Sequence, residues 1–412
     1  MTVAANPPRR PSTRSEFAAG WPVVLGADIG IAIGAAMTPM LAISVFMNSF
    51  EKEFGWSRTE ISLGSTIILA VLALTSPFIG WLADRVRSVW IATFGLTGLS
   101  ASYVALGSLG PDLRFFYLAC AGTAVIACGA GTTTFARAVS ECFVRQRGLA
   151  LGIAMVGTGV TAILMPAVLA PYAAQHGWRA GYRLLALVVA CGTPLVALLM
   201  SRAPRPACGS VGTEAGSGGK AILAAALGGR VFWTLAVCFV VIPLSLAGML
   251  VHLLAFLHDA GVDPASAGMI AGSAGLTQIV CRVLSGWLID RFFAPGIATV
   301  MMVTSAVGLG LVAVFGAPLV LLAPLAFGIA LGAEIDLLGF LTARYFGMLA
   351  YGRIYGLLYA ATMLGSAVSP IFYGVSFDLT GSYRAALFLG SALLLLSGAL
   401  FATLPPFPED AA

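Results

Sequence analysis

Long apolar runs alternate with short polar segments along the whole chain, and each run is close to the length that crosses a lipid bilayer. A helix rises about 1.5 Å per residue, so about 20 apolar residues span a hydrocarbon core of about 30 Å. Twelve such runs lie near residues 21–46, 61–83, 89–109, 115–138, 149–173, 182–201, 231–257, 267–289, 297–315, 319–343, 354–377 and 385–404. The pattern predicts an all-α integral membrane protein with twelve transmembrane helices.

The composition agrees with this prediction and excludes a soluble fold. Hydrophobic residues make up 59% of the chain and charged residues 9%, whereas soluble domains carry about 25% charged residues. The sequence holds no P-loop and no extramembrane segment long enough for an enzyme domain, so neither an enzyme nor an ATP-driven pump is expected. The seven cysteines are scattered without a CxxC spacing. We therefore predict no cofactor, no metal site and no nucleic-acid partner.

The distribution of basic residues predicts the orientation in the membrane. If the N-terminus lies inside, the inner segments hold 15 Lys and Arg residues and the outer segments hold six. Because loops rich in Lys and Arg remain in the cytoplasm, we expect both termini there and a multi-pass protein of the cell's inner (cytoplasmic) membrane. Residues 1–20 and 405–412 are predicted to be cytoplasmic tails, the first of them disordered.

The second half of the chain repeats features of the first. GWLADR at 80–85 returns as GWLIDR at 286–291, 206 residues later. Other matched segments in the fifth and eleventh apolar runs are about 204 residues apart. This repetition predicts two pseudo-symmetric six-helix bundles, 21–201 and 231–404, as in many transporters. The Gly-, Ala- and Pro-containing segment 202–230 is predicted to be a cytoplasmic linker between them.

These repeated elements resemble the signature of the major facilitator superfamily, and the resemblance extends over essentially the whole chain. The Gly-x-x-x-Asp-Arg frame of that signature is kept in both copies, but its trailing Gly-Arg-Arg is not. The resemblance implies a gate, in which glycine allows close helix approach and Asp84 faces the N-terminal end of a helix in the other half or pairs with Arg137. The gating candidates are Gly80, Asp84, Arg85, Arg137, Gly286, Asp290 and Arg291. Tight-turn and topology signals are the alternative interpretation.

Arg282 breaks the repeat, because Ser76 stands at the corresponding position of the first half. An arginine at this depth stays charged and needs an anion beside it. One interpretation is a permanent ion pair with Asp28, Glu334 or Asp336. The other is a contact with a substrate carboxylate, which the missing counterpart favours, since an architectural residue is more often repeated.

The acidic residues within the spans are candidates for carrying a proton. They are Asp28, Glu334 and Asp336, and a structural hydrogen-bonded acid is the alternative for each. Glu334 and Asp336 are two residues apart and so point about 200° apart around a helix, so we expect only one to face a central cavity. His252, nearer the outer end of its span, is a further candidate for proton uptake or substrate contact, with simple packing as the alternative.

Several segments resemble bacterial relatives of the monocarboxylate transporters and of the oxalate/formate antiporter, above all GAEIDLLGFLTARYFGMLAYGRIYG at 332–356. In the monocarboxylate transporters an arginine of the eighth helix holds the carboxylate, and Arg282 matches it. Their aspartate four residues earlier is Gln278 here, so the proton site must differ. The oxalate carrier's lysine of the eleventh helix has no counterpart in 354–377, and a single central cation favours a monoanion.

The resulting prediction is a secondary active transporter of small organic anions that works by alternating access. Proton-coupled symport of lactate- or pyruvate-like monocarboxylates is the first choice. An organic-anion exchanger and a drug or metabolite efflux antiporter are the alternatives. The predicted substrate-binding residues are Arg282, Tyr117, Thr277, Gln278, Tyr359 and His252. The expected partners are a small carboxylate, protons and the bilayer, and the chain is expected to be monomeric.

Overall fold

The computed structural model describes residues 13–34, 37–202, 218–259, 261–262 and 264–408, and these form helices without any strand. The first part of the chain forms α1 (Thr13–Ile33), α2 (Thr38–Phe54), α3 (Arg58–Ala83), α4 (Ser88–Leu106), α5 (Leu113–Ala127), the 3-10 turn η1 (Cys128–Ala130), α6 (Thr132–Cys142), α7 (Arg147–Ala154), α8 (Val156–His176) and α9 (Trp178–Ser201). The second part forms α10 (Gly218–Gly228), α11 (Arg230–Asp259), α12 (Pro264–Ile289), α13 (Ala294–Phe315), η2 (Ala317–Leu319), α14 (Leu322–Phe346), α15 (Tyr351–Thr380) and α16 (Arg384–Ala402).

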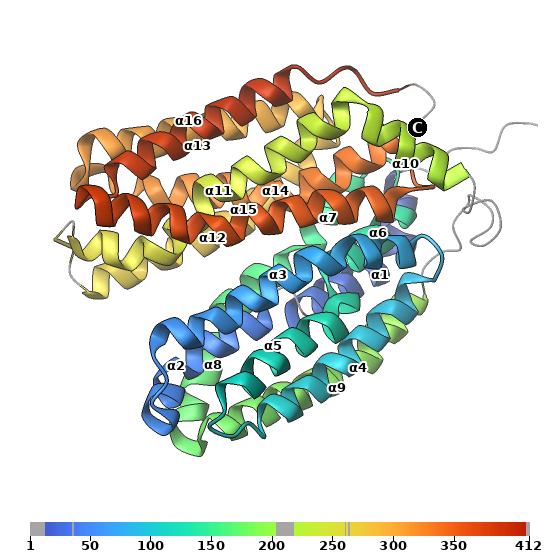
Figure 1. Cartoon of the computed structure of the whole chain (residues 1–412). Coiled ribbons are helices and arrows are strands. Elements are labelled where there is room, and N and C mark those ends of the chain that lie inside the picture. Colours follow the sequence, from blue (N-terminus) through green and yellow to red (C-terminus); the bar gives the residue numbers. More distant parts are fainter. Residues whose placement is uncertain (1–12, 35–36, 203–217, 260, 263, 409–412) are drawn as a thin grey trace, which may run out of the picture.

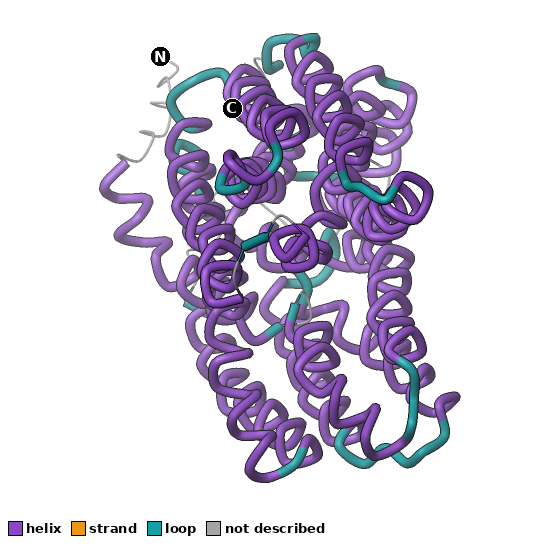
Figure 2. The backbone as a smooth tube through the Cα atoms, turned by 90° about the vertical axis from the view of Figure 1, so that its left-hand side faces the viewer, coloured by secondary structure: helices purple, strands orange, loops and turns teal. Residues whose placement is uncertain are grey.

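These helices confirm the predicted fold class. Within the described residues, 11 helical stretches are long and apolar enough to cross a membrane. The remaining predicted span, 267–289, corresponds to α12, whose apolar part runs over Ser273–Ile289. Between the described helices, Figure 2 shows short loops and turns.

The helices form two groups, α1–α9 and α11–α16. Figure 1 shows that the groups converge at the end of the molecule where α1 begins and α16 ends, and diverge toward the end that carries α2. We call the first end the terminal end. Contacts between the groups run mainly through α3 with α15 and through α12 with α7 and α8. The described part of the chain is therefore one bundle of two halves that meet at the terminal end.

Glycines bring the halves together at two related crossings. A side chain on Gly80 of α3 would overlap the backbone of Gly352 on α15, and one on Gly286 of α12 would overlap the backbone of Gly148 on α7. Small residues permit this approach, as in other tightly packed membrane helices. The two crossings involve corresponding elements of the two halves, so the sequence repeat is also a repeat of contacts.

One turn deeper, the same crossings define the surroundings of Arg282. Gly152 of α7 packs against the carbonyl oxygen of Arg282, and Gly356 of α15 packs against that of Ser76. Arg282 and Ser76 therefore occupy equivalent positions on α12 and α3.

Three apolar runs that the sequence pattern predicts as continuous helices are interrupted. The first is divided between α1 and α2, the fourth by η1 between α5 and α6, and the fifth at Met155 between α7 and α8. The second break falls in the segment Cys128-Gly-Ala-Gly131, where the low helix propensity of glycine weakens the helix. Hydrophobicity does not change at these points, so the apolar pattern gives no sign of them.

The segment predicted as a linker differs from the prediction in one respect. It contains α10, whose sequence AILAAAL is rich in strong helix formers. This helix packs against α11 and α15. The chain between the halves therefore ends in a helix docked on the second half.

Candidate functional site

Asp84, just after α3, caps the start of α15 in the other half. Its side chain is 0% exposed, and Oδ1 accepts a hydrogen bond of 2.8 Å from the backbone N–H of Gly352. Oδ2 accepts bonds from the backbone N–H and from Nε of Arg353, at 3.2 and 3.1 Å. Arg137 of α6 also donates to Oδ1. Both contacts considered in the sequence analysis, with a helix start and with Arg137, are thus present together.

Asp290, just after α12, makes the equivalent cap on α7. Its carboxylate accepts hydrogen bonds from the backbone N–H groups of Gly148 and Leu149, at 2.7 and 2.8 Å. Carboxylates at helix N-termini satisfy free amides and interact favourably with the helix dipole. Burial nevertheless raises the pKa of Asp290 to about 6, against the opposing effect of these two amides. No arginine among the described residues donates a hydrogen bond to Asp290. The two caps therefore differ, because the Asp84 carboxylate also accepts from arginine side chains.

The arginines of the two repeated elements lie outside these caps. Arg85 stacks on Trp81, with its guanidinium carbon 4.2 Å from the ring centroid, and Arg291 stacks on Trp287 at 4.1 Å. Both arginines are exposed. Their positions suit anchoring at a membrane interface, where aromatic and basic residues are common.

Arg282 lies at the centre of a buried, charged cluster between α12, α14 and α15. The residue is 4% exposed, and its Nη1 is 3.7 Å from Oδ1 of Asp336, whose side chain is 0% exposed. Glu334, also buried, interacts electrostatically with the same guanidinium. The Nε and Nη1 groups of Arg282 make no hydrogen bond to any described residue. Unsatisfied buried donors of this kind are rare and costly.

The prediction that only one of the two acids faces a central cavity stays a prediction, but both acids lie close to Arg282. Asp336 forms the ion pair, and Glu334 lies within electrostatic range of the same guanidinium. Glu334 and Asp336 both interact with Arg282. The 200° angle is measured at the axis of α14, but the long arginine side chain extends from α12 across the helix interface. As a result, the guanidinium comes within electrostatic range of both carboxyl groups.

Tyrosines of α15 extend this cluster, and Tyr359 among them is a predicted substrate contact. The rings of Tyr351, Tyr355 and Tyr359 follow one another with centroids 5.5 and 6.1 Å apart. Tyr355 lies near Asp336 and Arg282, and Tyr359 lies near Glu334. The hydroxyl of Tyr355 has no hydrogen-bond partner among the described residues, and the hydroxyl of Thr362 lies beside Glu334. Their spacing of three or four residues on one helix is the signal that could have identified them.

Asp28 occupies a different place. Its carboxylate accepts a 2.6 Å hydrogen bond from the backbone N–H of Gly157, at the start of α8. Nearby, the Thr161 hydroxyl donates to the carbonyl oxygen of Ala32, at 2.6 Å. These contacts join the broken first and fifth spans within one half. The observed partner of Asp28 is therefore a helix start and not Arg282.

The other predicted substrate contacts are spread over the molecule. His252 lies between the Pro370 carbonyl, at 3.2 Å, and the Tyr383 hydroxyl, at 3.3 Å, inside the second half. The hydroxyl of Tyr117 donates to the carbonyl of Glu60, far from Arg282 in the chain. Thr277 donates to Ser273 of its own helix, and both Thr277 and Gln278 pack against Gly328 of α14. Of the predicted substrate residues, Arg282 and Tyr359 are those that the structure brings to the charged cluster.

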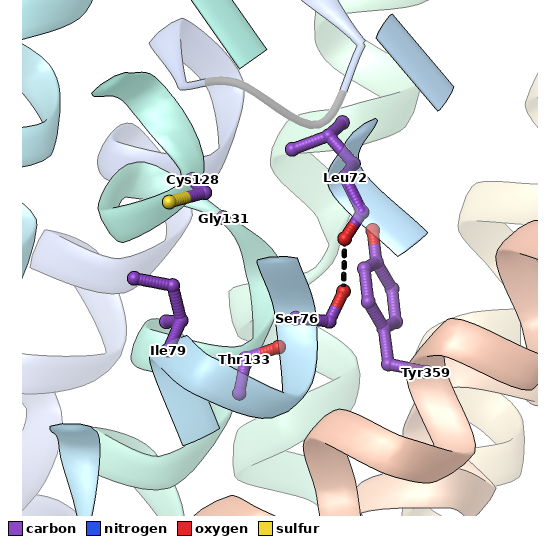
Figure 3. Close-up of a pocket in the computed structure, with 7 residues that line it drawn as sticks. All are labelled: Leu72, Ser76, Ile79, Cys128, Gly131, Thr133 and Tyr359. Atoms are coloured by element: carbon purple, nitrogen blue, oxygen red, sulfur yellow. Dashed lines mark hydrogen bonds between the residues drawn. The ribbon is translucent and has the colours of Figure 1, made fainter. Parts of the chain in front are cut away.

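A small cavity lies on the first-half side of Tyr359, about 10 Å³ in volume. Figure 3 shows the side chains of Ser76, Thr133 and Tyr359 around it, with Tyr359 contributed by the second half. The remaining lining residues are Leu72, Ile79, Cys128 and Gly131. The cavity thus lies between the halves and beside the break that separates α5 from α6.

The fold and this site define a class of protein. Two similar helical halves meet at one end of the molecule, and buried charges lie at their interface, as in membrane carriers that are not enzymes. Comparison with known proteins then gives the family: the Major Facilitator Superfamily profile matches residues 28–292. The chain belongs to the Major Facilitator Superfamily, and it is a multi-pass membrane transport protein.

Relatives and solved structures agree with this assignment. Monocarboxylate transporter 13 of Bos taurus is 29% identical over 94% of this chain and 90% of its own length. Monocarboxylate transporter 11 of Homo sapiens is 25% identical over 94% of this chain and 83% of its own length. The crystal structure of the human organic anion transporter MFSD10 (TETRAN) shares the fold, with a TM-score of 0.72, 15% identity and coverage of 96% and 100% of the two chains.

The two caps should differ in their sensitivity to charge removal. Asp84→Asn removes the buried carboxylate that both Arg137 and Arg353 contact, although Arg137 keeps its ion pair with Glu141. Breaking a buried ion pair costs about 3–5 kcal/mol of stability. Asp290→Asn keeps an oxygen that can accept one backbone N–H. Among the described residues, no arginine that donates to Asp290 loses its acceptor. We therefore expect the free energy of unfolding to fall by about 1 kcal/mol. Thermal unfolding of the purified variants measures the difference. Equal losses of stability would contradict the inequality of the caps.

Asp28 should tolerate asparagine but not alanine. Asparagine keeps an oxygen that can accept the Gly157 amide, whereas alanine removes the cap at a cost of about 0.5–2 kcal/mol. We expect Asp28→Asn to keep proton-driven uptake and its pH profile, and Asp28→Ala to lose thermal stability. A loss of proton dependence in Asp28→Asn with exchange intact would instead identify Asp28 as the proton carrier.

Proposed function

We propose that this protein is a proton-coupled symporter of small monocarboxylates that works by alternating access between its two halves. The observation that carries this proposal is the buried guanidinium of Arg282, whose Nε and Nη1 lack hydrogen bonds to the described residues while two acids lie beside it. A planar guanidinium with free donors suits a carboxylate, which can accept two parallel hydrogen bonds. The names of the related monocarboxylate transporters support the same substrate class.

The charges of the cluster support coupling to protons. Arg282 contributes one positive charge, and Glu334 and Asp336 contribute two negative charges when both are ionised. Excess charge within a membrane protein is costly, so the cluster without substrate favours one protonated acid. A bound carboxylate adds a negative charge, which a second proton on the other acid neutralises. In this scheme each monoanion is accompanied by one proton.

The contacts between the halves support alternating access. Both carboxylate caps and all four crossing glycines lie at the terminal end. With the termini in the cytoplasm, as the basic residues indicate, the closed gate is the cytoplasmic one and the conformation faces outward. Opening this gate requires Asp84 and Asp290 to leave α15 and α7, while the opposite ends of the halves approach each other.

Arg282 should be indispensable for uptake. In proteoliposomes with an inward proton gradient, we expect Arg282→Ala to abolish uptake of radiolabelled short monocarboxylates, because the carboxylate loses its cation. Arg282→Lys keeps the charge without the planar pair of donors and should retain a small fraction of uptake with a raised KM. Uptake by Arg282→Ala at the rate of the unmodified protein would refute the assignment.

Variants of Glu334 and Asp336 should lose proton-coupled accumulation but keep substrate exchange. Glu334→Gln and Asp336→Asn fix an acid in a neutral form, so proton-driven accumulation should fall while exchange of labelled for unlabelled substrate continues. A protonophore should abolish accumulation by the unmodified protein. Accumulation that a protonophore does not affect would favour an anion exchanger, and substrate efflux driven by inward proton flow would favour an antiporter.

A further inference from the structure

The hydroxyl of Tyr355 is a buried donor that takes no part in the packing of α15. The residue is 0% exposed, and its hydroxyl makes no hydrogen bond to any described residue. Unpaired buried polar groups are rare in native proteins, and many of them belong to functional sites. The position of this hydroxyl relative to Arg282 therefore bears on the proposed transport.

The ring of Tyr355 packs against the part of α14 that carries the charged cluster. A Cβ atom added to Gly339 would lie 3.6 Å from Cε2 of Tyr355, the ring atom next to the carbon that bears the hydroxyl. Gly339 follows Asp336 by three residues, so the two positions are neighbours on one face of the helix. Arg282, whose Nη1 is 3.7 Å from Oδ1 of Asp336, reaches the same face from α12. Both Asp336 and Arg282 interact electrostatically with Tyr355.

The backbone places Tyr355 at the depth of Arg282. Its neighbour Gly356 packs against the carbonyl of Ser76, and Gly152 packs against the carbonyl of Arg282. Ser76 and Arg282 are equivalent residues of the two halves, so the two crossings mark the same distance from the terminal end. Tyr355 and Arg282 therefore lie in one layer of the bundle.

The polar groups of this layer suit an additional carboxylate. Nε and Nη1 of Arg282 and the Tyr355 hydroxyl are donors without hydrogen bonds to the described residues. The carboxylate of Asp336 does not satisfy them, because its 3.7 Å separation from Nη1 is too long for a hydrogen bond. A carboxylate has two oxygens with about four lone-pair sites, so it can accept from a guanidinium and a hydroxyl together. A neutral ligand would use the hydroxyl but would not match the charge of the guanidinium.

We propose that the Tyr355 hydroxyl donates a hydrogen bond to the substrate carboxylate that Arg282 holds. This inference rests on the proposed function. The bound carboxylate then joins α12 to α15, whose first turn, four residues before Tyr355, is capped by Asp84. The negative charge that the substrate adds beside Asp336 is balanced by the proton of the coupling scheme. The alternative acceptor for the same hydroxyl is the carboxylate of Asp336.

Removal of the hydroxyl alone tests the proposal in proteoliposomes. Tyr355→Phe keeps the ring beside those of Tyr351 and Tyr359 and removes only the donor. We expect the KM for propionate, lactate and pyruvate to rise about tenfold, as for one lost hydrogen bond to a charged group, while the maximal rate changes less than twofold. The rise should be equal for the three acids, because the carboxylate is the group that they share.

Tyr182→Phe is the matched control. Tyr182 is also 0% exposed, and its hydroxyl also lacks a hydrogen bond to the described residues, but it lies in the first half between Phe46 and Trp178. This variant should keep the KM of the unmodified protein for every acid. Thermal unfolding shows whether both variants are folded. Because a bound ligand stabilises the folded state, added propionate should raise the Tm less in Tyr355→Phe than in Tyr182→Phe.

The other outcomes of these measurements overturn the inference. If Arg282→Ala abolishes uptake but Tyr355→Phe keeps an unchanged KM, the inference fails and the proposed function stands. A changed pH dependence of uptake with an unchanged KM assigns the hydroxyl to Asp336 instead. A raised KM for lactate and pyruvate but not for propionate assigns it to a different substrate oxygen. If the unmodified protein takes up none of the three acids, the proposed function fails and the inference fails with it.

A high-resolution map of the unmodified protein with propionate gives a test that needs no variant. The hydroxyl oxygen of Tyr355 should lie within about 3 Å of a carboxylate oxygen of propionate. A propionate bound at Arg282 with a larger separation, or with a water molecule between the two oxygens, overturns the direct contact.

Discussion

The terminal end of this transporter depends on one interaction that occurs twice: a carboxylate at the end of one half caps the first turn of a helix in the other half. Free backbone amides and buried carboxylates are each costly away from water, and the contact satisfies both. The carboxylate must approach along the helix axis, because it accepts from the second and third residues of α15 or α7. The crossing glycines make this approach possible. Each carboxylate cap and its glycine crossing therefore depend on one another. Together they also set how far Arg282 and Ser76 lie from the terminal end.

The two halves share this unit but place their buried charges differently. In the first half, Arg137 donates to Asp84 at the terminal end, and the residue equivalent to Arg282 is the uncharged Ser76. In the second half, no arginine within the described residues donates to Asp290, and the cation lies deeper, beside two acids. The first half also has interrupted spans, which Asp28 and Thr161 join by hydrogen bonds to backbone groups. The first half thus places its buried ion pair at the terminal end, and the second half places its buried charges one turn or more deeper in the bundle.

The sequence predicts those parts of this arrangement that leave a repeated or periodic signal. The apolar runs gave the twelve spans, and the recurrence of GWLADR led to Asp84 and its contact with Arg137. The helix breaks could not be predicted, because hydrophobicity reports burial in lipid and not backbone hydrogen bonding. The partner of Asp28 is a backbone amide. Nearly every residue carries such an amide, so the sequence does not show which one Asp28 contacts. The ion pair of Arg282 with Asp336 and its electrostatic effect on Glu334 depend on how α12 packs against α14, and helix periodicity alone does not specify that packing.

In the proposed mechanism, the position of the Arg282 cluster relative to the two carboxylate caps determines how a bound substrate can affect the contacts between the halves. Arg282 lies on α12, and Asp290 directly follows this helix, eight residues or about 12 Å further along at the helical rise. Helix α15 likewise carries both the capped start and the tyrosines. A ligand shifts a conformational equilibrium only if it binds the two states with different affinity. A substrate held by Arg282 alone would contact a single half and would remain bound equally well when the halves rotate. A substrate held by Arg282 that also touches side chains of the first half contacts both halves, so its affinity changes as they move. Contact with both halves is therefore the condition under which binding at the centre can drive the gate.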